Sequence, residues 1–201
     1  MEPDPELAAR YEDQYRKFKL LYPALKPVFK EIARSNTMDW KYKKHYDCWC
    51  REHIVYCDKP TDPKNQCLSI YVPAAYMKEG GSLTTRGGAV YTAKTMPVVY
   101  LNIIGGYWSA RLIGPLMMQG KYLKEGYVVV TVRARGRNTP GGRGKAPATL
   151  VNLKAGIRYL RCHRNELPGD YDKIITVGTS AGGAMSSLLG CTRDRADYLR
   201  S

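Results

Sequence analysis

Residues 173–190 read KIITVGTSAGGAMSSLLG, and this stretch decides the fold. Residues 173–177 are rich in β-branched side chains and predict a strand, whereas the Ala-, Met- and Leu-containing residues after Gly183 can form a helix. Between them stands G-x-S-x-G, the pattern of a nucleophile elbow, in which a strained turn presents a serine hydroxyl. Ser180 is therefore the candidate nucleophile. The alternative interpretation is an ordinary strand-to-helix turn that is rich in small residues.

Glycines surround this serine. Gly178 and Gly182 would remove Cβ clashes where the turn brings neighbouring chain close, and the chain leaves the turn through Gly183. The first N–H groups of a helix have no acceptor within that helix. The backbone N–H of Ala181 is therefore predicted to be free to bind an oxyanion.

Two further apolar runs, residues 97–104 and 127–132, predict strands that are covered on both faces. A helix is expected over residues 112–125, between these two strands, and another is expected to open at Pro147, before the strand that carries Ser180. Alternation of strands and helices predicts an α/β fold with these three strands in a parallel sheet. Ligands in such sheets bind at the carboxyl ends of the strands.

The part of the chain before residue 97 predicts other elements. Residues 46–56 and 67–72 are expected to form an antiparallel pair of strands, and residues 80–88, with two Gly-Gly pairs, a loop. We expect residues 1–44 to form a helical, basic N-terminal extension and residues 45–201 to belong to the main domain.

The loop after residues 97–104 continues as Gly105-Gly106-Tyr107. An oxyanion site needs two donors. This loop is expected at the carboxyl ends of the parallel strands, as is Ser180. Gly106 and Tyr107 are therefore the candidates for the second donor beside Ala181. The alternative interpretation of the loop is a tight turn without a catalytic role.

A serine needs a base to take its proton, and in this architecture the chain order is serine, acid, histidine. His45, His53 and His163 all precede Ser180. Asp194 and Asp197 follow it too closely to be the acid, and Asp170 and Asp172 are expected at the opposite end of the strand. We therefore expect an incomplete α/β-hydrolase fold, the N-terminal portion of a longer enzyme through its nucleophile elbow. As an isolated fragment this portion is expected to be inactive, with the nucleophile strand at the sheet edge.

The formal net charge of +14 raises the question of an anionic partner. No recognised nucleic-acid-binding motif accompanies the Lys and Arg residues, so we predict a solvated basic surface and no nucleic-acid partner. No run approaches the ~18 apolar residues of a membrane span, and the first residues lack the features of a signal peptide. A cytoplasmic protein without a membrane partner is therefore expected, and nucleic-acid binding is the alternative. The oligomeric state stays open.

Two segments contain residue types that are common in metal and cofactor sites. Cys48-x-Cys50, His53 and Cys57 crowd one segment, but their spacing matches no common zinc pattern, so thiols without a metal are predicted. The Gly- and Arg-rich residues 133–146 fit neither a P-loop nor a dinucleotide fingerprint. No cofactor and no metal are expected.

Several short motifs, in this order and spacing, resemble a known family. They lie between about Val72 and Gly190: VPAAY at 72–76, GGY at 105–107, GYVVV at 126–130, RGR at 135–137, KAPA at 145–148, LKA at 153–155, IRY at 157–159, LPGD at 167–170 and GTSAGG at 178–183. Together they resemble the bacterial tannases of the α/β-hydrolase fold and the feruloyl- and carboxylesterase-like proteins around them.

The resemblance implies a serine esterase that cleaves galloyl or related phenolic esters through an acyl-enzyme on Ser180, with a small-molecule ester as its partner. It also implies that the acid, the histidine and the residues that grip the galloyl hydroxyls lie much further along the chain. A general carboxylesterase fits the chemistry equally well. The alternative from another class is a non-catalytic or degenerate hydrolase-fold protein that binds a partner through its basic N-terminal face.

Overall fold

A computed structural model describes residues 15, 17, 40–109 and 116–192. The chain divides into two units, residues 1–39 and 40–201. Of the first unit, Tyr15 and Lys17 are described, and both are helical; the rest of the expected helical extension lies outside the described residues. The main sheet already begins at Lys41, before the expected boundary at residue 44. No helix in the described ranges is long and apolar enough to cross a membrane.

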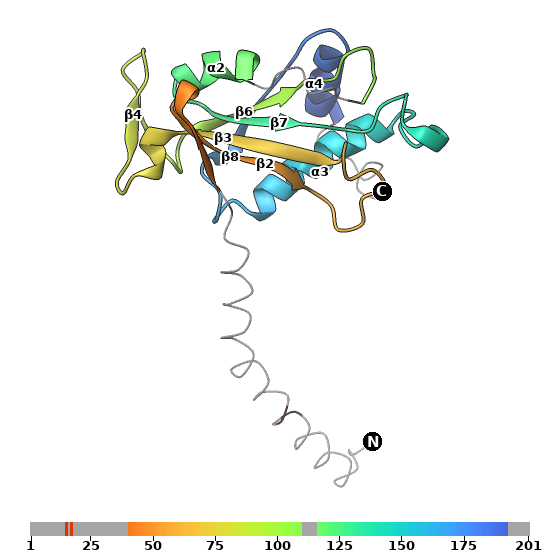
Figure 1. The fold of residues 1–201 in the computed structure, drawn as a ribbon, viewed down its shortest axis with the longest axis horizontal. Coiled ribbons are helices and arrows are strands. Elements are labelled where there is room, and N and C mark those ends of the chain that lie inside the picture. The colour runs from red at the N-terminus through yellow and green to blue at the C-terminus, as the bar shows by residue number, and fades with distance from the viewer. Residues whose placement is uncertain (1–14, 16, 18–39, 110–115, 193–201) are drawn as a thin grey trace. The chain divides into compact units, whose positions relative to one another are not determined.

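The second unit is built on a six-stranded sheet in the order β1-β2-β3-β7-β6-β8 (Figure 1). Its strands are β1 (Lys41–Lys43), β2 (Cys48–Val55), β3 (Cys67–Pro73), β6 (Pro97–Asn102), β7 (Val128–Val132) and β8 (Asp170–Gly178). β6 pairs in parallel with both β7 and β8, which confirms the expected parallel arrangement of these three strands. β2 and β3 form the expected antiparallel pair.

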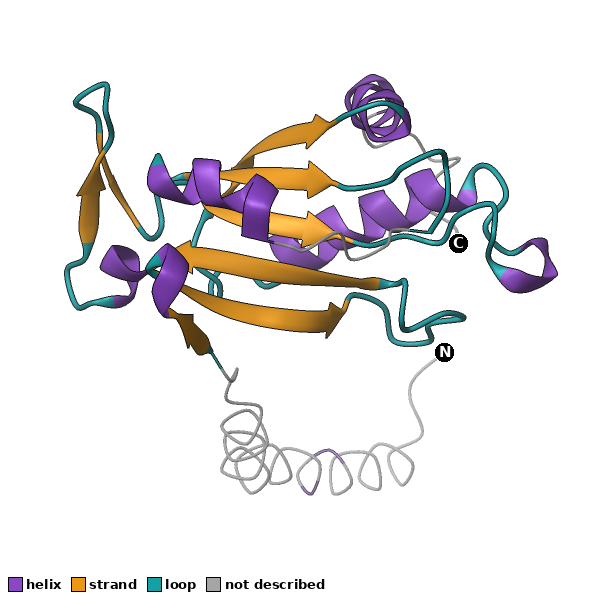
Figure 2. Ribbon diagram, turned by 45° about the horizontal axis from the view of Figure 1, so that its top comes forward, coloured by secondary structure: helices purple, strands orange, loops and turns teal. Residues whose placement is uncertain are grey.

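The sheet as a whole is mixed, because β3 also pairs antiparallel with β7. A turn joins β2 to β3 without a crossover helix, so the two strands must run in opposite directions. β8 is the last strand in the described order. Figure 2 shows the three neighbouring parallel strands ending at one edge of the sheet, where their following loops gather.

Three α-helices follow the parallel strands: α2 (Leu116–Lys124), α3 (Ala148–Cys162) and α4 (Ala181–Thr192). α2 falls within the helix expected over residues 112–125. It ends at Lys124 and is followed two residues later by Gly126, whose φ of +86° is in the left-handed region that favours glycine. The structure also contains three short 3₁₀ helices: η1 (Lys44–Tyr46), η2 (Ala74–Met77) and η3 (Pro140–Gly142).

Both faces of the central strands are buried, as their continuous apolar runs predicted. Successive side chains of a strand point to opposite faces. On one face Val99 and Leu101 of β6 pack in a core cluster with Leu123 of α2. On the other face the hydroxyl of Tyr100 donates to the main-chain oxygen of Leu153 in α3 at 2.8 Å. The helices thus cover opposite faces, and the parallel strands are held between them.

The prediction of a loop over residues 80–88 is wrong. Residues 80–88, predicted as a loop, contain β4 (Ser82–Thr84), which pairs with β5 (Val90–Thr92) in a small separate hairpin. Each strand has three residues with an exposed–intermediate–exposed burial pattern. Such short strands carry no apolar alternation long enough to predict them from sequence.

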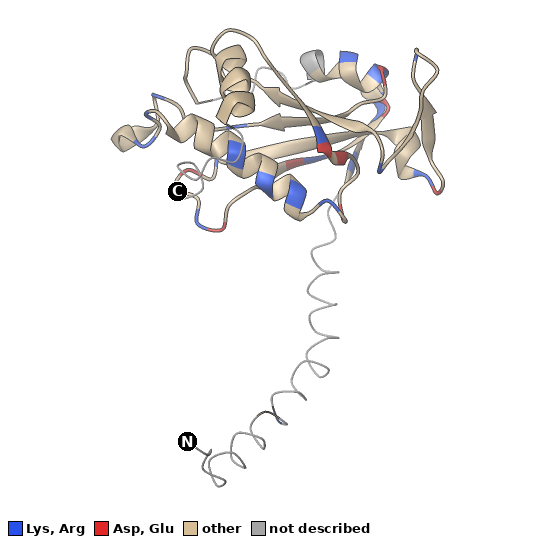
Figure 3. Ribbon diagram, turned by 180° about the vertical axis from the view of Figure 1, so that it is seen from behind, with Lys and Arg blue, Asp and Glu red and all other residues tan. Residues whose placement is uncertain are grey.

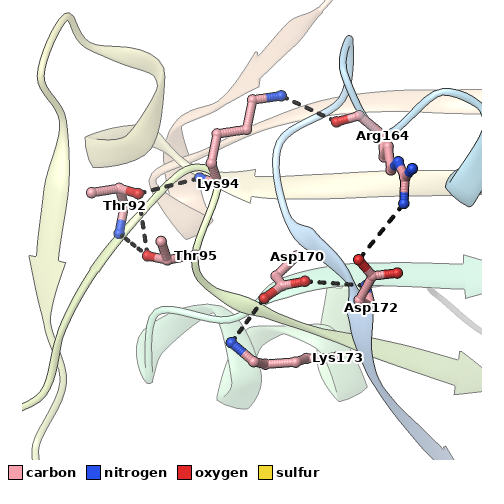
Figure 4. A network of polar contacts seen from close by, with 7 residues as sticks. All are labelled: Thr92, Lys94, Thr95, Arg164, Asp170, Asp172 and Lys173. Atoms are coloured by element: carbon pink, nitrogen blue, oxygen red, sulfur yellow. Dashed lines mark hydrogen bonds and ion pairs between the residues drawn. The ribbon is translucent and has the colours of Figure 1, made fainter.

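A network of polar contacts joins the segment before β6 to the amino end of β8 (Figure 4). The ammonium of Lys94 donates to the main-chain oxygens of Arg164, Asn165 and Leu167 at 3.0–3.2 Å. The carboxylate of Asp170 lies 2.9 Å from the Lys173 ammonium, whose hydrogen bond lowers the pKa of Asp170. These contacts close the turn between α3 and β8 at the end of the sheet opposite Ser180.

The six cysteines divide by burial. Cys48 and Cys50 are fully buried on β2 within the same core cluster as Val99, and Cys67 is also buried. Cys162 and Cys191 are exposed, and all six are free thiols. In the described ranges, no group of three or more His, Cys, Asp or Glu side chains could hold a metal ion.

We expect this division to govern thiol reactivity. The pKa of Cys48 is raised to about 11, mainly by burial and secondly by the charge of the neighbouring Cys50. Its reactive thiolate is therefore on the order of 0.1% of the total at pH 8. With Ellman's reagent and the native protein at pH 8, Cys162 and Cys191 should react quickly, and Cys48 and Cys50 should react only after unfolding. Peptide mass spectrometry identifies the labelled positions; fast labelling of Cys48 in the native protein would contradict the buried arrangement.

Candidate active site

Ser180 lies in the two-residue turn between the end of β8 at Gly178 and the start of α4 at Ala181. Its φ is +57°, in the left-handed region that residues other than glycine rarely adopt. The residue is exposed, and no other described residue lies in hydrogen-bond contact with its hydroxyl. The strained turn therefore exposes Ser180 at the carboxyl ends of the parallel strands, where its hydroxyl has no partner among the described residues.

The turn is closed so tightly that two of its positions have no room for a side chain. A Cβ on Gly178 would lie 2.4 Å from both the carbonyl carbon and the oxygen of Gly182. A Cβ on Gly182 would lie 2.6 Å from the main-chain oxygen of Asn102 and 3.2 Å from that of Ile104. At Gly183 the nearest contact would be 3.3 Å, to the Gly178 oxygen. Strand, turn and helix are thus in direct backbone contact.

α4 begins immediately after the serine. The N–H of Gly182 donates to the Thr179 oxygen at 3.0 Å, and that of Ala184 donates to the Ser180 oxygen at 3.1 Å. Ala181 is the first helical residue, so its N–H has no acceptor within the helix. This N–H is adjacent in the chain to the serine hydroxyl and is suited to bind negative charge that develops there.

The loop that follows β6 reaches the same edge. Asn102 at the end of β6 is the register partner of Gly178 at the end of β8, so the two following loops start about 5 Å apart, the spacing of paired strands. Gly106 and Tyr107 have φ values of +56° and +60°, and both residues are exposed. The structure therefore places these two candidate donors in a loop next to the serine turn.

The loop after β7 clamps this second loop from the other side. The N–H of Arg137 donates to the Tyr107 oxygen at 2.8 Å, and the N–H of Ser109 donates to the Asn138 side-chain oxygen at 2.7 Å. The Arg137 guanidinium lies over the ring of Trp108 at 5.1 Å. These contacts connect Tyr107, Trp108 and Ser109 to the loop after β7, and such support favours a preorganised donor.

Asn102 belongs to this site, although sequence reasoning did not single it out. Its side chain is buried (3% exposed), and its amide nitrogen donates to the Gly182 oxygen at 3.0 Å. Its side-chain oxygen accepts from the N–H of Ile104 at 3.4 Å. The available signal was a single carboxamide within the otherwise apolar run of residues 97–104.

None of the three histidines is brought to Ser180. His163 follows the end of α3, on the way to the amino end of β8, and its Nδ1 lies 2.8 Å from the Tyr159 oxygen. His45 lies in η1, before β2. His53 is on β2, which is separated from β8 by β3, β7 and β6, or about 19 Å at the usual strand spacing. Asp170 and Asp172 lie at the amino end of β8, and Asp194 and Asp197 are outside the described residues.

A groove is formed by residues other than those of the site. Its lining combines residues of α3, β8 and α4, among them Arg158, Arg161, Ile174 and Leu189, and does not include Ser180. Figure 3 shows that basic residues recur along α3. Lys154 in this row is buried (6% exposed), so the row is not a uniformly solvated surface.

Comparisons with known proteins agree on one group. A family model described as BD-FAE matches residues 90–199, more than half of the chain. A tannase of Fusobacterium nucleatum is 36% identical, with a TM-score of 0.66 over 76% of this chain and 33% of that one. The native tannin acyl hydrolase of Lactobacillus plantarum is 38% identical, with a TM-score of 0.67 over 75% of this chain and 34% of that one.

A tannin acyl hydrolase solved in complex with ethyl gallate shows the same similarity, with 38% identity, a TM-score of 0.67 and coverage of 75% of this chain and 34% of that one. The chain thus spans about a third of the length of these solved structures. No curated protein sequence matches it.

Proposed function

The chain belongs to the BD-FAE family, and from this premise we propose that it is the serine-bearing part of an esterase that hydrolyses phenolic, galloyl-type esters through an acyl-enzyme on Ser180. The observation that carries the proposal is the exposed Ser180 with a φ of +57° at the end of a parallel strand. A residue held in this rare conformation by surrounding backbone is characteristic of a site where strain serves function.

The proposed reaction has two stages. The Ser180 oxygen forms a bond to the ester carbonyl carbon as a general base takes the hydroxyl proton, and the tetrahedral intermediate then expels the alcohol, which receives that proton. Water next attacks the acyl-enzyme in the same way and releases the acid. The oxyanion of each intermediate would accept from the N–H of Ala181 and from a second N–H, at Gly106 or Tyr107.

The base and the acid that orients it are proposed to come from outside the described residues. His45, His53 and His163 are all held elsewhere in the fold, in η1, in β2 and after the end of α3. Contact with Ser180 would require the base to approach the exposed face of the elbow, where the hydroxyl has no competing partner among the described residues.

The phenolic substrate class is supported by the similar structures. Tannin acyl hydrolase structures were solved with ethyl gallate and with 3,4-dihydroxybenzoate, and both ligands contain an aromatic ring that carries hydroxyls. We transfer to this chain the class of acyl group, a hydroxylated benzoyl, and propose a small-molecule ester as the partner. A general carboxylesterase with the same elbow is the nearest alternative.

The proposal is tested by ester hydrolysis with the intact protein, which means the form that includes the proposed base and acid. We expect release of gallate from methyl gallate, measured by liquid chromatography, with a kcat/KM at least tenfold above that for methyl benzoate, because hydroxyl-binding groups discriminate strongly against an analogue that lacks the hydroxyls. Activity on 4-nitrophenyl acetate, with no preference for methyl gallate over methyl benzoate, would support a general carboxylesterase. Absence of hydrolysis of all three esters would contradict an esterase.

A non-catalytic hydrolase-fold protein is the second candidate, and the positions of the three histidines favour it. It predicts that the intact protein neither hydrolyses esters nor reacts with a labelled fluorophosphonate. An esterase, by contrast, should be labelled at Ser180, because the activated hydroxyl displaces fluoride from phosphorus.

A further inference from the structure

The strongest unassigned feature of the site is the way that Asn102 joins its two halves. The Asn102 side chain is almost fully buried at the end of β6. Its two polar ends contact different segments: the first turn of α4, through the Gly182 oxygen, and the loop that leads to Gly106 and Tyr107, through the N–H of Ile104.

The contact is built for a carboxamide. The oxygen of Gly182 requires a donor, and the N–H of Ile104 requires an acceptor. A carboxamide supplies one of each, a carboxylate supplies acceptors only, and an aliphatic side chain of the same size supplies neither. Because both partners are backbone groups of opposite kind, they also determine which end of the carboxamide points to which segment.

The backbone reinforces this bridge. The main-chain oxygen of Asn102 would lie only 2.6 Å from a Cβ on Gly182, so strand and helix already touch at this point. Asn102 therefore contacts both the helix that begins with Ala181 and the loop that carries Gly106 and Tyr107, and it fixes the position of each relative to the other. A displacement of catalytic groups by about 1 Å is enough to lower the rate roughly 10²-fold.

We propose that Asn102 is a positioning residue of the oxyanion site, which holds the N–H of Ala181 and the N–H groups of Gly106 and Tyr107 at the separation that one oxyanion needs. The inference rests on the proposed esterase function. Asn102 does not touch the substrate; it acts through the two segments that do.

Kinetics of the intact protein on methyl gallate test the proposal. Asn102→Ala should lower kcat by 10- to 100-fold and leave KM within about twofold, because the oxyanion forms only in the transition state. An arylboronic acid, which forms a tetrahedral adduct with serine, should bind more weakly by the same factor as kcat falls, whereas binding of gallate should change by less than twofold.

Tyr100→Phe is the matched control. Tyr100 is fully buried two residues earlier on the same strand, and the change removes its hydrogen bond to the Leu153 oxygen without touching the site. Its kcat should stay within twofold of the wild-type value. An Asn102→Ala variant whose kcat also stays within twofold of wild type would overturn the proposal.

Asn102→Asp provides a second variant that keeps the size of the side chain. Its carboxylate would set an acceptor against the Gly182 oxygen, so activity should be low at pH 8. Burial raises the pKa of such a carboxyl, and the protonated acid can donate again. The ratio of variant to wild-type kcat should therefore rise as the pH falls, and a ratio independent of pH would count against a hydrogen-bonded bridge.

Amide hydrogen exchange separates this inference from the proposed function. If the wild-type protein hydrolyses no ester, the esterase proposal fails, but the bridge still predicts that the hydrogen-bonded amides of Ile104 in the loop and of Gly182 and Ala184 in α4 exchange at least tenfold faster in Asn102→Ala than in Tyr100→Phe. Exchange in both segments within twofold of the control would overturn the bridge, and Asn102→Asp at pH 8 serves for this comparison if the alanine variant does not fold.

Discussion

Replacing Ser180 by alanine is expected to lower kcat of the intact enzyme by on the order of 10⁴- to 10⁶-fold, the range found when a serine nucleophile is removed. Without the hydroxyl no acyl-enzyme can form, and what remains is the binding and polarisation of the ester by the oxyanion donors. KM should change little, because the hydroxyl takes part mainly in the chemical steps. Single-turnover and steady-state kinetics on methyl gallate give both values.

The substitution is structurally conservative. Serine and alanine share a Cβ, so the φ of +57° at this position is no more strained in the variant. Ser187→Ala is the matched control, because Ser187 lies on α4 and its hydroxyl contacts only the Gly183 oxygen at 3.2 Å among the described residues. It should retain wild-type kcat within twofold. A Ser180→Ala variant with more than a tenth of wild-type turnover would exclude Ser180 as the nucleophile.

Gly178→Ala is expected to lower the free energy of unfolding by about 3 kcal/mol or more. The added Cβ would lie 2.4 Å from the carbon and oxygen of Gly182 and 2.9 Å from the nitrogen of Gly183. All three are backbone atoms at the start of α4, so no flexible side chain can move aside. Relief requires that β8 and α4 separate.

Gly190→Ala is the control for this variant. Gly190 lies on the same helix, and a Cβ added there would meet nothing within 4 Å. Alanine in an open helical position should stabilise the protein by about 0.5–1 kcal/mol. Urea denaturation followed by circular dichroism measures both, and a Gly178→Ala variant as stable as Gly190→Ala would contradict the close approach at the elbow.

The two experiments examine different properties of one turn. The serine variant should fold like the wild type and lose its chemistry, whereas the glycine variant should lose stability first. Loss of stability in Ser180→Ala would indicate that the hydroxyl has a structural partner, in conflict with its exposure.

The sequence by itself determined the central strands and the elbow. The runs over residues 97–104 and 127–132 are local patterns, because burial on both faces requires apolar residues at successive positions of one strand. Residues 173–177 are exposed or half-buried in β8, and their local signal is instead the concentration of β-branched residues. The pattern G-x-S-x-G is local in part: Gly178 approaches Gly182 and Gly183, a few residues further along the chain, whereas Gly182 approaches Asn102 and Ile104 of a distant segment. The exposed three-residue strands β4 and β5 carry no such pattern and were missed.

Only the tertiary structure decided which distant segments meet. The bond from Asn102 to Gly182 joins residues 80 positions apart, and the clamp of Asn138 on Ser109 spans 29. Neither contact gives a periodic signal in the sequence. A carboxamide can bond to water or to any backbone group, and only packing selects its partner. The antiparallel pairing of β3 with β7, which makes the sheet mixed, has the same origin: strand composition specifies that a strand forms, whereas its neighbours depend on how the connections fold back.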